Sequence, residues 1–322
     1  MPWPAPASEG APGAPSATNR HTSRVPAAAH PTAPGAVADL PIRLIALDID
    51  GTIVGDDLVL HDRTIRAVAE ARRRGVHVSI VTGRMTSSAA GFARRLGLDG
   101  PIVGYQGAIA RTLPPAGDTG LGRLLWHRPL TADVARRIVH WTREAGLEPH
   151  FNDLERLVLR SDEPRADDYS AFVGGRLTLV PDLEEWLAGR ATVTKVIAVG
   201  DGSRPRGAYA AAVEAFGRES EVTISHPRFL EFVAPGVTKG AALARLARRY
   251  RVPMAQVMAI GDQLNDIEMI AAAGHGVAME NAPAEVRSVA RYVAPHVDDQ
   301  GAARMIEELV LDRPAPVAAR GV

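Results

Sequence analysis

The sequence predicts an α/β protein: a doubly wound parallel sheet with a second, smaller α/β domain inserted into it. Three observations favour this fold class. Short apolar runs rich in strand-forming residues alternate with segments of helical periodicity, which is typical of a parallel sheet covered on both faces. The alternation is interrupted near the middle of the chain, at roughly 127–228. The length of 322 residues is about right for two domains.

Four apolar runs are the expected strands of the parallel sheet. They lie at residues 42–47, 76–81, 101–103 and 256–260. Helical segments separate or follow them, at 64–74, 239–251 and 264–273. Two of these helices run up to a glycine, Gly75 and Gly274, which is the usual residue just after the end of a helix.

The middle segment reads as a self-contained α/β unit. It offers helices at 131–145 and 209–216, and strands at 148–152, 156–160 and 193–199. We therefore expect residues 41–126 and 229–312 to form one core, and residues 127–228 to form an inserted domain.

The two ends of the chain differ from the rest in composition. Residues 1–40 are rich in Pro and Ala, and residues 313–322 are similar. Such segments have too few large apolar side chains to offset the entropy lost on ordering. We expect both to be disordered tails.

Composition excludes several functional classes. Lys+Arg and Asp+Glu are both 37, and this zero net charge argues against a nucleic-acid partner. There is no Cys, so disulfides, thiolate metal sites and Cys nucleophiles are excluded. No stretch approaches the ~18 apolar residues of a membrane span, and the first residues lack the pattern of a secretory signal. We expect a soluble, cytoplasmic protein with no membrane partner.

Polar residues follow the expected strands at the points where the strands end. The three segments are Asp48-Ile49-Asp50-Gly51-Thr52, Thr82-Gly83-Arg84 and Gly261-Asp262-Gln263-Leu264-Asn265-Asp266. Lys239 lies in the first turn of an expected helix. Because ligands of open parallel sheets bind beyond the carboxyl ends of the strands, we expect these residues to lie together.

Each of these features also has a purely structural explanation. Residues 48–51 could be a strand-to-turn exit, since Asp and Gly are common in turns. Asp262 and Asp266 could complement the dipole at a helix N-terminus, and Lys239 could be an exposed cation. Their combination favours another interpretation. Four carboxylates at one sheet edge call for a hard divalent cation, and Lys239 with Thr82 could hold a phosphoryl group beside it.

With these motifs, the sequence resembles the haloacid dehalogenase (HAD) superfamily of phosphohydrolases, in particular the Cof-type branch with a large α/β cap. The resemblance covers about residues 42–310. Besides the three strand-end segments, the matching residues are Val237-Thr238-Lys239-Gly240 and Val277-Ala278-Met279-Glu280-Asn281-Ala282. One departure is visible: branch members usually have Asn-Gly-Ala where this chain has Gln106-Gly107-Ala108.

The resemblance implies a role for each acidic residue. Asp48 is similar to the nucleophile that becomes an aspartyl-phosphate, and Asp50 to the general acid and base. Mg²⁺ would be bound by the side chains of Asp48 and Asp262 and the backbone carbonyl of Asp50. Asp266 would lie close to the metal. The metal would also reduce the repulsion between the carboxylate nucleophile and the phosphate.

The resemblance also implies a set of substrate-binding residues. Thr82 and Lys239 would take part in catalysis by holding the phosphoryl oxygens, and Arg84 and Asn281 would contact the substrate side. The full expected set is Gly51, Thr82, Gly83, Arg84, Lys239, Asn265 and Asn281.

The expected function is that of a Mg²⁺-dependent phosphatase acting on a small phosphorylated metabolite such as a sugar phosphate. Two alternatives stay open: a phosphomutase with the same intermediate, and a non-catalytic binding protein on this fold. The inserted domain at 127–228 would act as a cap. Because two linkers, expected near 123–128 and 226–231, connect it to the core, we expect it to close over the strand ends and to set specificity.

Overall fold

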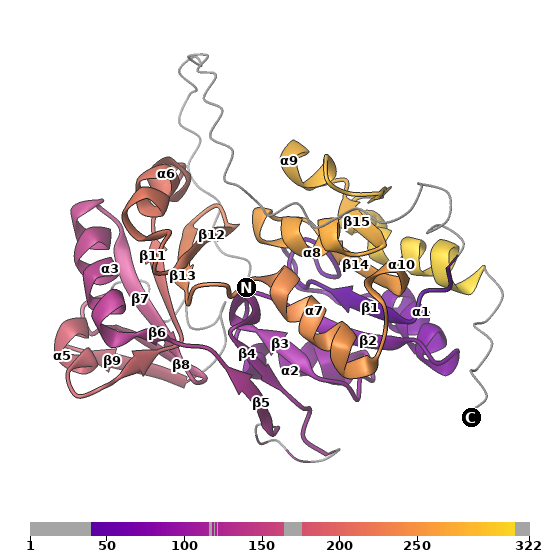
Figure 1. Ribbon diagram of the computed structural model, residues 1–322, viewed down its shortest axis with the longest axis horizontal. Coiled ribbons are helices and arrows are strands. Elements are labelled where there is room, and N and C mark those ends of the chain that lie inside the picture. Colours follow the sequence, from indigo (N-terminus) through magenta and orange to yellow (C-terminus); the bar gives the residue numbers. More distant parts are fainter. Residues whose placement is uncertain (1–39, 116–117, 119, 121, 164–175, 313–322) are drawn as a thin grey trace.

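The computed structural model describes residues 40–115, 118, 120, 122–163 and 176–312. The expected tails at 1–40 and 313–322 lie outside this range, apart from Leu40. Two α/β parts stand next to each other, one carrying α3 and α6 and the other carrying α1, α7 and α10 (Figure 1). The predicted fold class is confirmed. Across the described part of the chain, no helix combines the length and apolar character of a membrane span.

The larger part, here called the core, contains an eight-stranded sheet in the order β16-β15-β14-β1-β2-β3-β4-β5. Its strands are β1 (Leu44–Leu47), β2 (His77–Val81), β3 (Ile102–Gly104), β4 (Ile109–Arg111), β5 (Leu124–His127), β14 (Val257–Gly261), β15 (His275–Met279) and β16 (Tyr292–Ala294). Pairing is parallel from β16 to β3, and antiparallel from β3 through β4 to β5. The four predicted strands are therefore β1, β2, β3 and β14, all in the parallel part.

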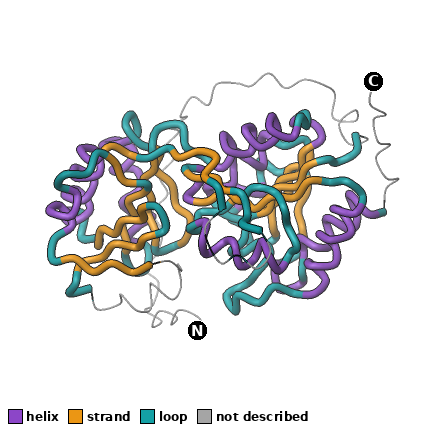
Figure 2. Tube along the Cα trace, turned by 90° about the horizontal axis from the view of Figure 1, so that it is seen from below, coloured by secondary structure: helices purple, strands orange, loops and turns teal. Residues whose placement is uncertain are grey.

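Helices cover both faces of the core sheet (Figure 2). They are α1 (Asp62–Arg73), α2 (Thr86–Arg95), α7 (Lys239–Tyr250), α8 (Ile267–Ala272), α9 (Ala284–Arg287) and α10 (Gly301–Ile306). Short 3₁₀ helices are η1 (Tyr105–Gly107), η2 (Met254–Gln256), η3 (Leu264–Asp266) and η4 (Val297–Asp299), and a π-helix, η5 (Glu307–Leu311), follows α10. Ile45 and Leu47 of β1 pack with α1, α2 and α10, whereas Leu44 and Ala46 pack with α7 and α8. Burial on both faces explains why β1 reads as an unbroken apolar run.

The smaller part, here called the cap, contains a six-stranded sheet in the order β12-β13-β11-β7-β8-β9. Its strands are β7 (Glu148–Asp153), β8 (Arg156–Arg160), β9 (Arg176–Val180), β11 (Lys195–Val199), β12 (Glu221–His226) and β13 (Phe229–Val233). A two-stranded sheet joins β6 (Leu130–Thr131) to β10 (Thr192–Val193). The helices α3 (Ala132–Glu144), α5 (Leu183–Leu187) and α6 (Arg204–Phe216) pack on one face of the larger sheet.

The strand pairing moves one predicted boundary. β13 pairs with β11 and β12 of the cap, so the expected return to the core at residue 229 falls inside a cap hairpin. Pro227 and Arg228 form the tight turn of that hairpin and are not part of a linker. The predicted strand at 193–199 is also divided, between β10 and β11.

The second face of the cap sheet packs on the core. Leu157, Ile197 and Phe229 from this face share an apolar cluster with Tyr105 and Ile109 of the core. The cap sheet therefore lies between its own helices and the carboxyl end of the core sheet, where the strand-end motifs lie.

Candidate active site

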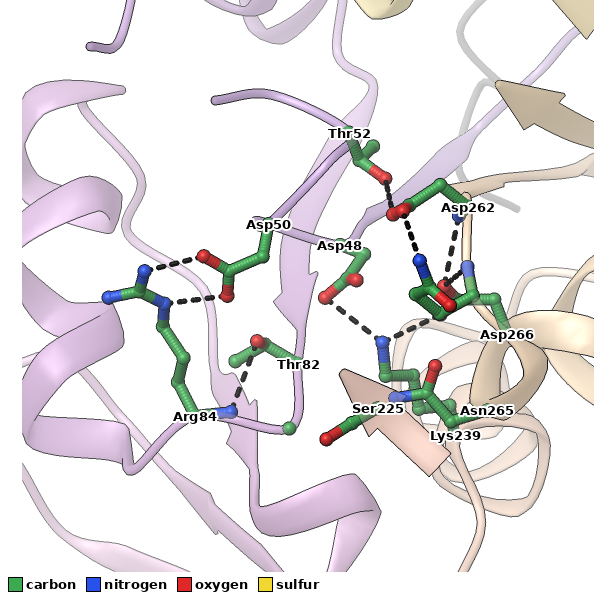
Figure 3. Close-up of polar contacts among 12 residues, drawn as sticks. Asp48, Asp50, Thr52, Thr82, Arg84, Ser225, Lys239, Asp262, Asn265 and Asp266 are labelled. Carbon is green, nitrogen blue, oxygen red and sulfur yellow. Dashed lines mark hydrogen bonds and ion pairs between the residues drawn. The ribbon is translucent and has the colours of Figure 1, made fainter. Parts of the chain in front are cut away.

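Asp48 is the first residue beyond β1, and its side chain is buried between the two sheets. Its backbone N–H donates to the Ile260 carbonyl at 3.1 Å, which ties the residue to the end of β14. Lys239 Nζ lies 3.0 Å from Asp48 Oδ1 (Figure 3). Burial raises the pKa of Asp48 to about 7 despite the opposing effect of Lys239. The carboxyl group is thus held in a site that disfavours its charge unless further positive charge is present.

Lys239 is fully enclosed in the first turn of α7. Thr238 caps this helix by accepting a hydrogen bond from the Ala241 N–H at 3.0 Å. Nζ donates to Asp266 Oδ1 at 2.6 Å in addition to its ion pair with Asp48. Burial alone would lower the pKa of Lys239, but the two carboxylates raise it above its usual value. The structural explanation of Lys239 as an exposed cation is therefore wrong, because its ammonium group is buried between two carboxylates.

The loop after β14 positions Asp262 and Asp266. Asp266 Oδ2 accepts hydrogen bonds from the backbone N–H groups of Asp262 and Gln263, both at 3.0 Å. Thr52 Oγ1 donates to Asp262 Oδ1 at 2.9 Å. Burial, together with the neighbouring Asp266, raises the pKa of Asp262 well above its usual value. Both oxygens of Asp266 accept from other groups, and Asp262 Oδ2 likewise accepts from Gln263 Nε2 at 3.3 Å, so hydrogen bonds within the core hold both carboxylates in place.

The acidic residues could hold a metal ion. One carboxylate oxygen each from Asp48, Asp262 and Asp266 lie within 4.8 Å of one another, and all three residues are buried. Lys239 is the single cation that contacts these side chains within the described part of the chain. Three buried carboxylates around one ammonium leave an excess of negative charge, which is costly without another cation. Oxygen ligands of this kind fit a hard divalent ion.

The turn after Asp48 needs glycine at position 51. Gly51 has φ of +72°, and a Cβ on it would lie 2.2 Å from Asp262 Oδ2. Asn281 Nδ2 donates to the Gly51 carbonyl at 2.9 Å, and Asn281 Oδ1 accepts from the Val297 N–H at 3.1 Å. The expected substrate contacts Gly51 and Asn281 thus hold the turn in place and do not line the pocket.

Arg84 fixes the side chain of Asp50. Arg84 Nε donates to Asp50 Oδ2 at 2.7 Å, and Nη2 makes a second bond to Oδ1, so the pair is bidentate (Figure 3). Thr82 Oγ1 accepts from the Arg84 backbone N–H at 3.2 Å. The Asp50 side chain stays 40% exposed, in contrast to Asp48. The two carboxyl groups of one turn therefore have different environments.

A pocket opens between these loops and the cap sheet. Its core side is formed by Asp48, Asp50, Thr82, Gly83, Arg84 and Asn265. Its cap side is formed by Asn152, Lys195, Ile197, Ser225, His226, Phe229 and Glu231. Lys239, Asp262 and Asp266 lie behind Asp48, outside the lining. The structure thus brings all the predicted acidic residues to one edge of the core sheet, with the cap above them.

The cap residues of the pocket were not predicted from the sequence. Lys195 and Glu231 are both 2% exposed and form an ion pair of 3.0 Å. Two signals could have indicated them. Glu231 interrupts the apolar run Phe229–Val233, and a buried charge in a strand needs a partner. The second signal is the rarity of lysine: the sequence contains two lysines, Lys195 and Lys239, and the rest of its Lys+Arg total is arginine.

Comparison with known proteins identifies the family. Residues 45–306 match the model of the haloacid dehalogenase-like hydrolases. An HMP-PP phosphatase of Cronobacter sakazakii is 32% identical, over 74% of this chain and 85% of the relative. A 5-amino-6-(5-phospho-D-ribitylamino)uracil phosphatase of Bacillus subtilis is 29% identical, over 82% and 96%.

Solved structures show the same fold. A haloacid dehalogenase-like hydrolase from Bacteroides thetaiotaomicron superposes with a TM-score of 0.69 at 25% identity, covering 83% of this chain and 99% of the other. A HAD/COF-like hydrolase from Plasmodium vivax gives 0.73 at 24% identity, covering 84% and 96%. The resemblance inferred from the motifs is confirmed: the chain belongs to the haloacid dehalogenase-like hydrolase family.

Proposed function

We propose that the protein is a Mg²⁺-dependent phosphatase that hydrolyses a small phosphorylated metabolite through an aspartyl-phosphate on Asp48. The enzyme class, phosphoric monoester hydrolase, follows from the family and from its phosphatase relatives. One observation carries the proposal. A buried carboxylate at the floor of a pocket lies 3.0 Å from a lysine and within 4.8 Å of two more carboxylates. This arrangement suits attack on phosphorus with charge neutralisation.

In the first step a carboxylate oxygen of Asp48 attacks phosphorus and the bond to the ester oxygen breaks. Asp50 gives a proton to the leaving oxygen, which departs as an alcohol. Asp50 suits this role because its side chain lines the pocket and remains partly exposed, where a leaving group can reach it. Lys239 offsets the negative charge that the attacking carboxylate and the phosphoryl group bring together.

In the second step water attacks the phosphorus of the aspartyl-phosphate. Asp50, now deprotonated, takes a proton from this water, and the bond between phosphorus and the Asp48 oxygen breaks. Inorganic phosphate leaves and the Asp48 carboxylate is restored. Arg84 donates to both oxygens of Asp50, and this pairing suits the deprotonated carboxylate that acts as the base in this step.

The donor set fits the metal. Asp48 and Asp262 would bind Mg²⁺ through their side chains and Asp50 through its backbone carbonyl, with Asp266 holding the loop that carries Asp262. When bound, the ion neutralises the carboxylates and the phosphate oxygens. Burial and the neighbouring carboxylates raise the pKa of Asp48 and of Asp262, so a cation that favours their charged forms would be well placed among them.

The cap side of the pocket supports a small, polar leaving group such as that of a sugar phosphate. Asn152, Ser225 and His226 offer hydrogen-bonding groups, and Phe229 offers an apolar surface. Two relatives are named as phosphatases of HMP-PP and of 5-amino-6-(5-phospho-D-ribitylamino)uracil, which are small phosphorylated substrates. We infer the same substrate class for this chain.

The test is a screen of phosphorylated metabolites with the purified protein, with Mg²⁺ or with EDTA. We expect inorganic phosphate release that needs Mg²⁺ and is absent from Asp48→Asn. Conversion of the ester to an isomer that retains its phosphate would favour a phosphomutase instead. Equal phosphate release in EDTA, or from Asp48→Asn, would contradict the proposal.

A further inference from the structure

Gln106 occupies a strained position beneath the cap. It lies in η1, directly after β3, and is 2% exposed. Its φ of 61° is in the left-handed region, as is that of Tyr105, and such values persist only where the surroundings hold them. Its backbone N–H donates to the Thr82 carbonyl at 3.1 Å. The turn therefore directs a buried amide side chain toward the pocket.

The side chain of Gln106 connects the cap to the loop after β14. Nε2 donates to Glu231 Oε2 of the cap at 2.7 Å. Oε1 accepts from Asn265 Nδ2 of the core at 2.8 Å. Asn265 lines the pocket beside Asp48 and is one of the expected phosphoryl contacts. One amide thus joins a cap carboxylate to a core residue of the active site.

The donor and acceptor roles in the hydrogen bonds between Glu231, Gln106 and Asn265 follow from the chemistry of their side chains. Glu231 Oε1 already accepts from Lys195 Nζ at 3.0 Å and from Ser225 Oγ at 2.7 Å. A carboxylate only accepts, so Gln106 must turn its NH₂ group toward Glu231 and its oxygen toward Asn265. Asn265 must then turn its own NH₂ group toward Gln106. The position of the cap carboxylate therefore sets the orientation of an amide in the core.

A second contact shows how tightly this amide is enclosed. A Cβ at Gly83 would lie 2.5 Å from Gln106 Nε2, so the amide fills the space that a side chain there would need. The Gly83 carbonyl accepts from Lys195 Nζ at 3.0 Å. The loop that carries Thr82 and Gly83 is thus held by the same cap lysine that holds Glu231.

We propose that Gln106 is a positioning residue that couples closure of the cap to the orientation of Asn265. When the cap is seated, Glu231 and Gln106 align the Asn265 amide beside the pocket. When the cap lifts, Glu231 leaves and the Asn265 amide loses its alignment. Glutamine is required because asparagine, one methylene shorter, cannot reach both partners. This inference rests on the proposed phosphatase function only for its kinetic readout.

The test uses the full chain, p-nitrophenyl phosphate with Mg²⁺, and hydrogen exchange of three segments. Two of them, 123–130 and 233–238, contain the connections between core and cap and are here called the linkers, and the third is the loop 262–267. Gln106→Glu sets a second carboxylate against Glu231, and we expect faster exchange in all three segments and about a tenfold fall in kcat. The double variant Gln106→Glu/Glu231→Gln restores a donor opposite an acceptor. We expect it to recover both readouts to within about threefold of the parent.

Two further variants separate coupling from general damage. Gln106→Asn keeps the amide but shortens it, and should speed exchange in the linkers even if Gln106→Glu does not fold. In an Asn265→Ala background, Gln106→Glu should cost kcat little, because the residue it positions is gone. Unchanged exchange in Gln106→Asn, or a double variant no better than Gln106→Glu, would overturn the proposal. If no protein releases phosphate, the proposed function fails, while the exchange of the single and double variants still decides the coupling.

Discussion

The core and the cap contribute to one pocket in different ways. The core supplies residues from loops that follow parallel strands, such as Asp48 after β1 and Asp262 after β14. The cap supplies residues from within its strands, such as Lys195 of β11 and Glu231 of β13. The core residues surround the place where phosphorus would react, and the cap residues face them across the pocket.

This difference follows from the two kinds of sheet. Carboxyl ends of parallel strands share one edge, so their loops converge and carry compact motifs. In the cap, side chains alternate between two faces, so Phe229 and Glu231 face the core while Leu230 packs with the cap helices. We infer that the core determines the chemistry and the cap determines which leaving group is accepted. The predictions below test this division, beginning with the largest effect.

If the core determines the chemistry, catalysis should require its proposed nucleophile, Asp48. In Asp48→Asn the amide is nearly isosteric but is a poor nucleophile, and we expect kcat to fall by more than ~10³-fold. Phosphate release is the measurement, with circular dichroism to verify the fold. Asp56→Asn, an exposed Asp on the same segment, is the matched control and should keep full activity. Near-parental turnover by Asp48→Asn would refute the assignment.

Lys239 tests whether the buried cation acts on the chemical step. We expect Lys239→Ala to lower kcat by roughly 10²-fold or more, because an electrostatic contact at the transferring phosphoryl group is lost. Lys239→Arg should not recover this loss, since its larger guanidinium does not fit between Asp48 and Asp266. Steady-state kinetics decide the matter. An effect confined to KM would show that Lys239 anchors the substrate instead.

Asn152 tests the cap's part in selectivity. It is 1% exposed, lines the pocket, and its Nδ2 has no hydrogen-bond partner among the described residues. We expect Asn152→Leu to lower kcat/KM for the preferred metabolite about tenfold, the effect of one lost hydrogen bond. Activity on p-nitrophenyl phosphate should stay within about twofold, since this ester lacks the natural leaving group. Equal losses on both substrates would place Asn152 in the chemistry of the core.

The smallest expected effect concerns stability and pH. The pKa of Asp48 is about 7 in the folded state against an ordinary 3.8, so the folded state holds its proton more firmly. The resulting stabilisation is complete below pH ~4 and is lost as the pH rises through ~7. In EDTA, Tm should therefore be a few degrees higher at pH 5 than at pH 8. Asp48→Asn should reduce this dependence.

The stabilisation by Mg²⁺ should depend on pH in the opposite direction, increasing as the pH rises. Because Mg²⁺ binds the deprotonated carboxylates, the rise in Tm on adding it should be larger at pH 8 than at pH 5. Thermal unfolding with and without Mg²⁺ at the two pH values measures this. A Tm gain that does not depend on pH would indicate that the ion binds elsewhere.

Much of the core could be predicted from the sequence, because its site residues adjoin apolar strands. Asp48, Thr82 and Asp262 each follow such a run, and the geometry of a parallel sheet brings the ends of the runs together. Asn281 is an exception. Its partner is the backbone carbonyl of Gly51, 230 residues earlier, and a motif does not reveal such a contact.

The cap could be predicted only in outline. Its main helices and several strands were found, but which strand faces the pocket depends on pairing. The β11–β13 register sets Ile197 opposite Glu231, and this brings Lys195 near that carboxylate. Gln106 is similar, since its departure from the usual Asn was visible but its partner on the cap was not. Such contacts depend on tertiary packing, which periodicity does not encode.

The formation of an aspartyl-phosphate on Asp48 is the central claim, and rapid quenching within the first turnover tests it most directly. The protein is mixed with Mg²⁺ and a phosphate ester labelled on phosphorus, quenched in acid, digested and mapped by mass spectrometry. We predict label on the peptide that contains Asp48, rising before phosphate release, and none in Asp48→Asn. Release of phosphate in that same turnover with no labelled peptide at any time would contradict the account.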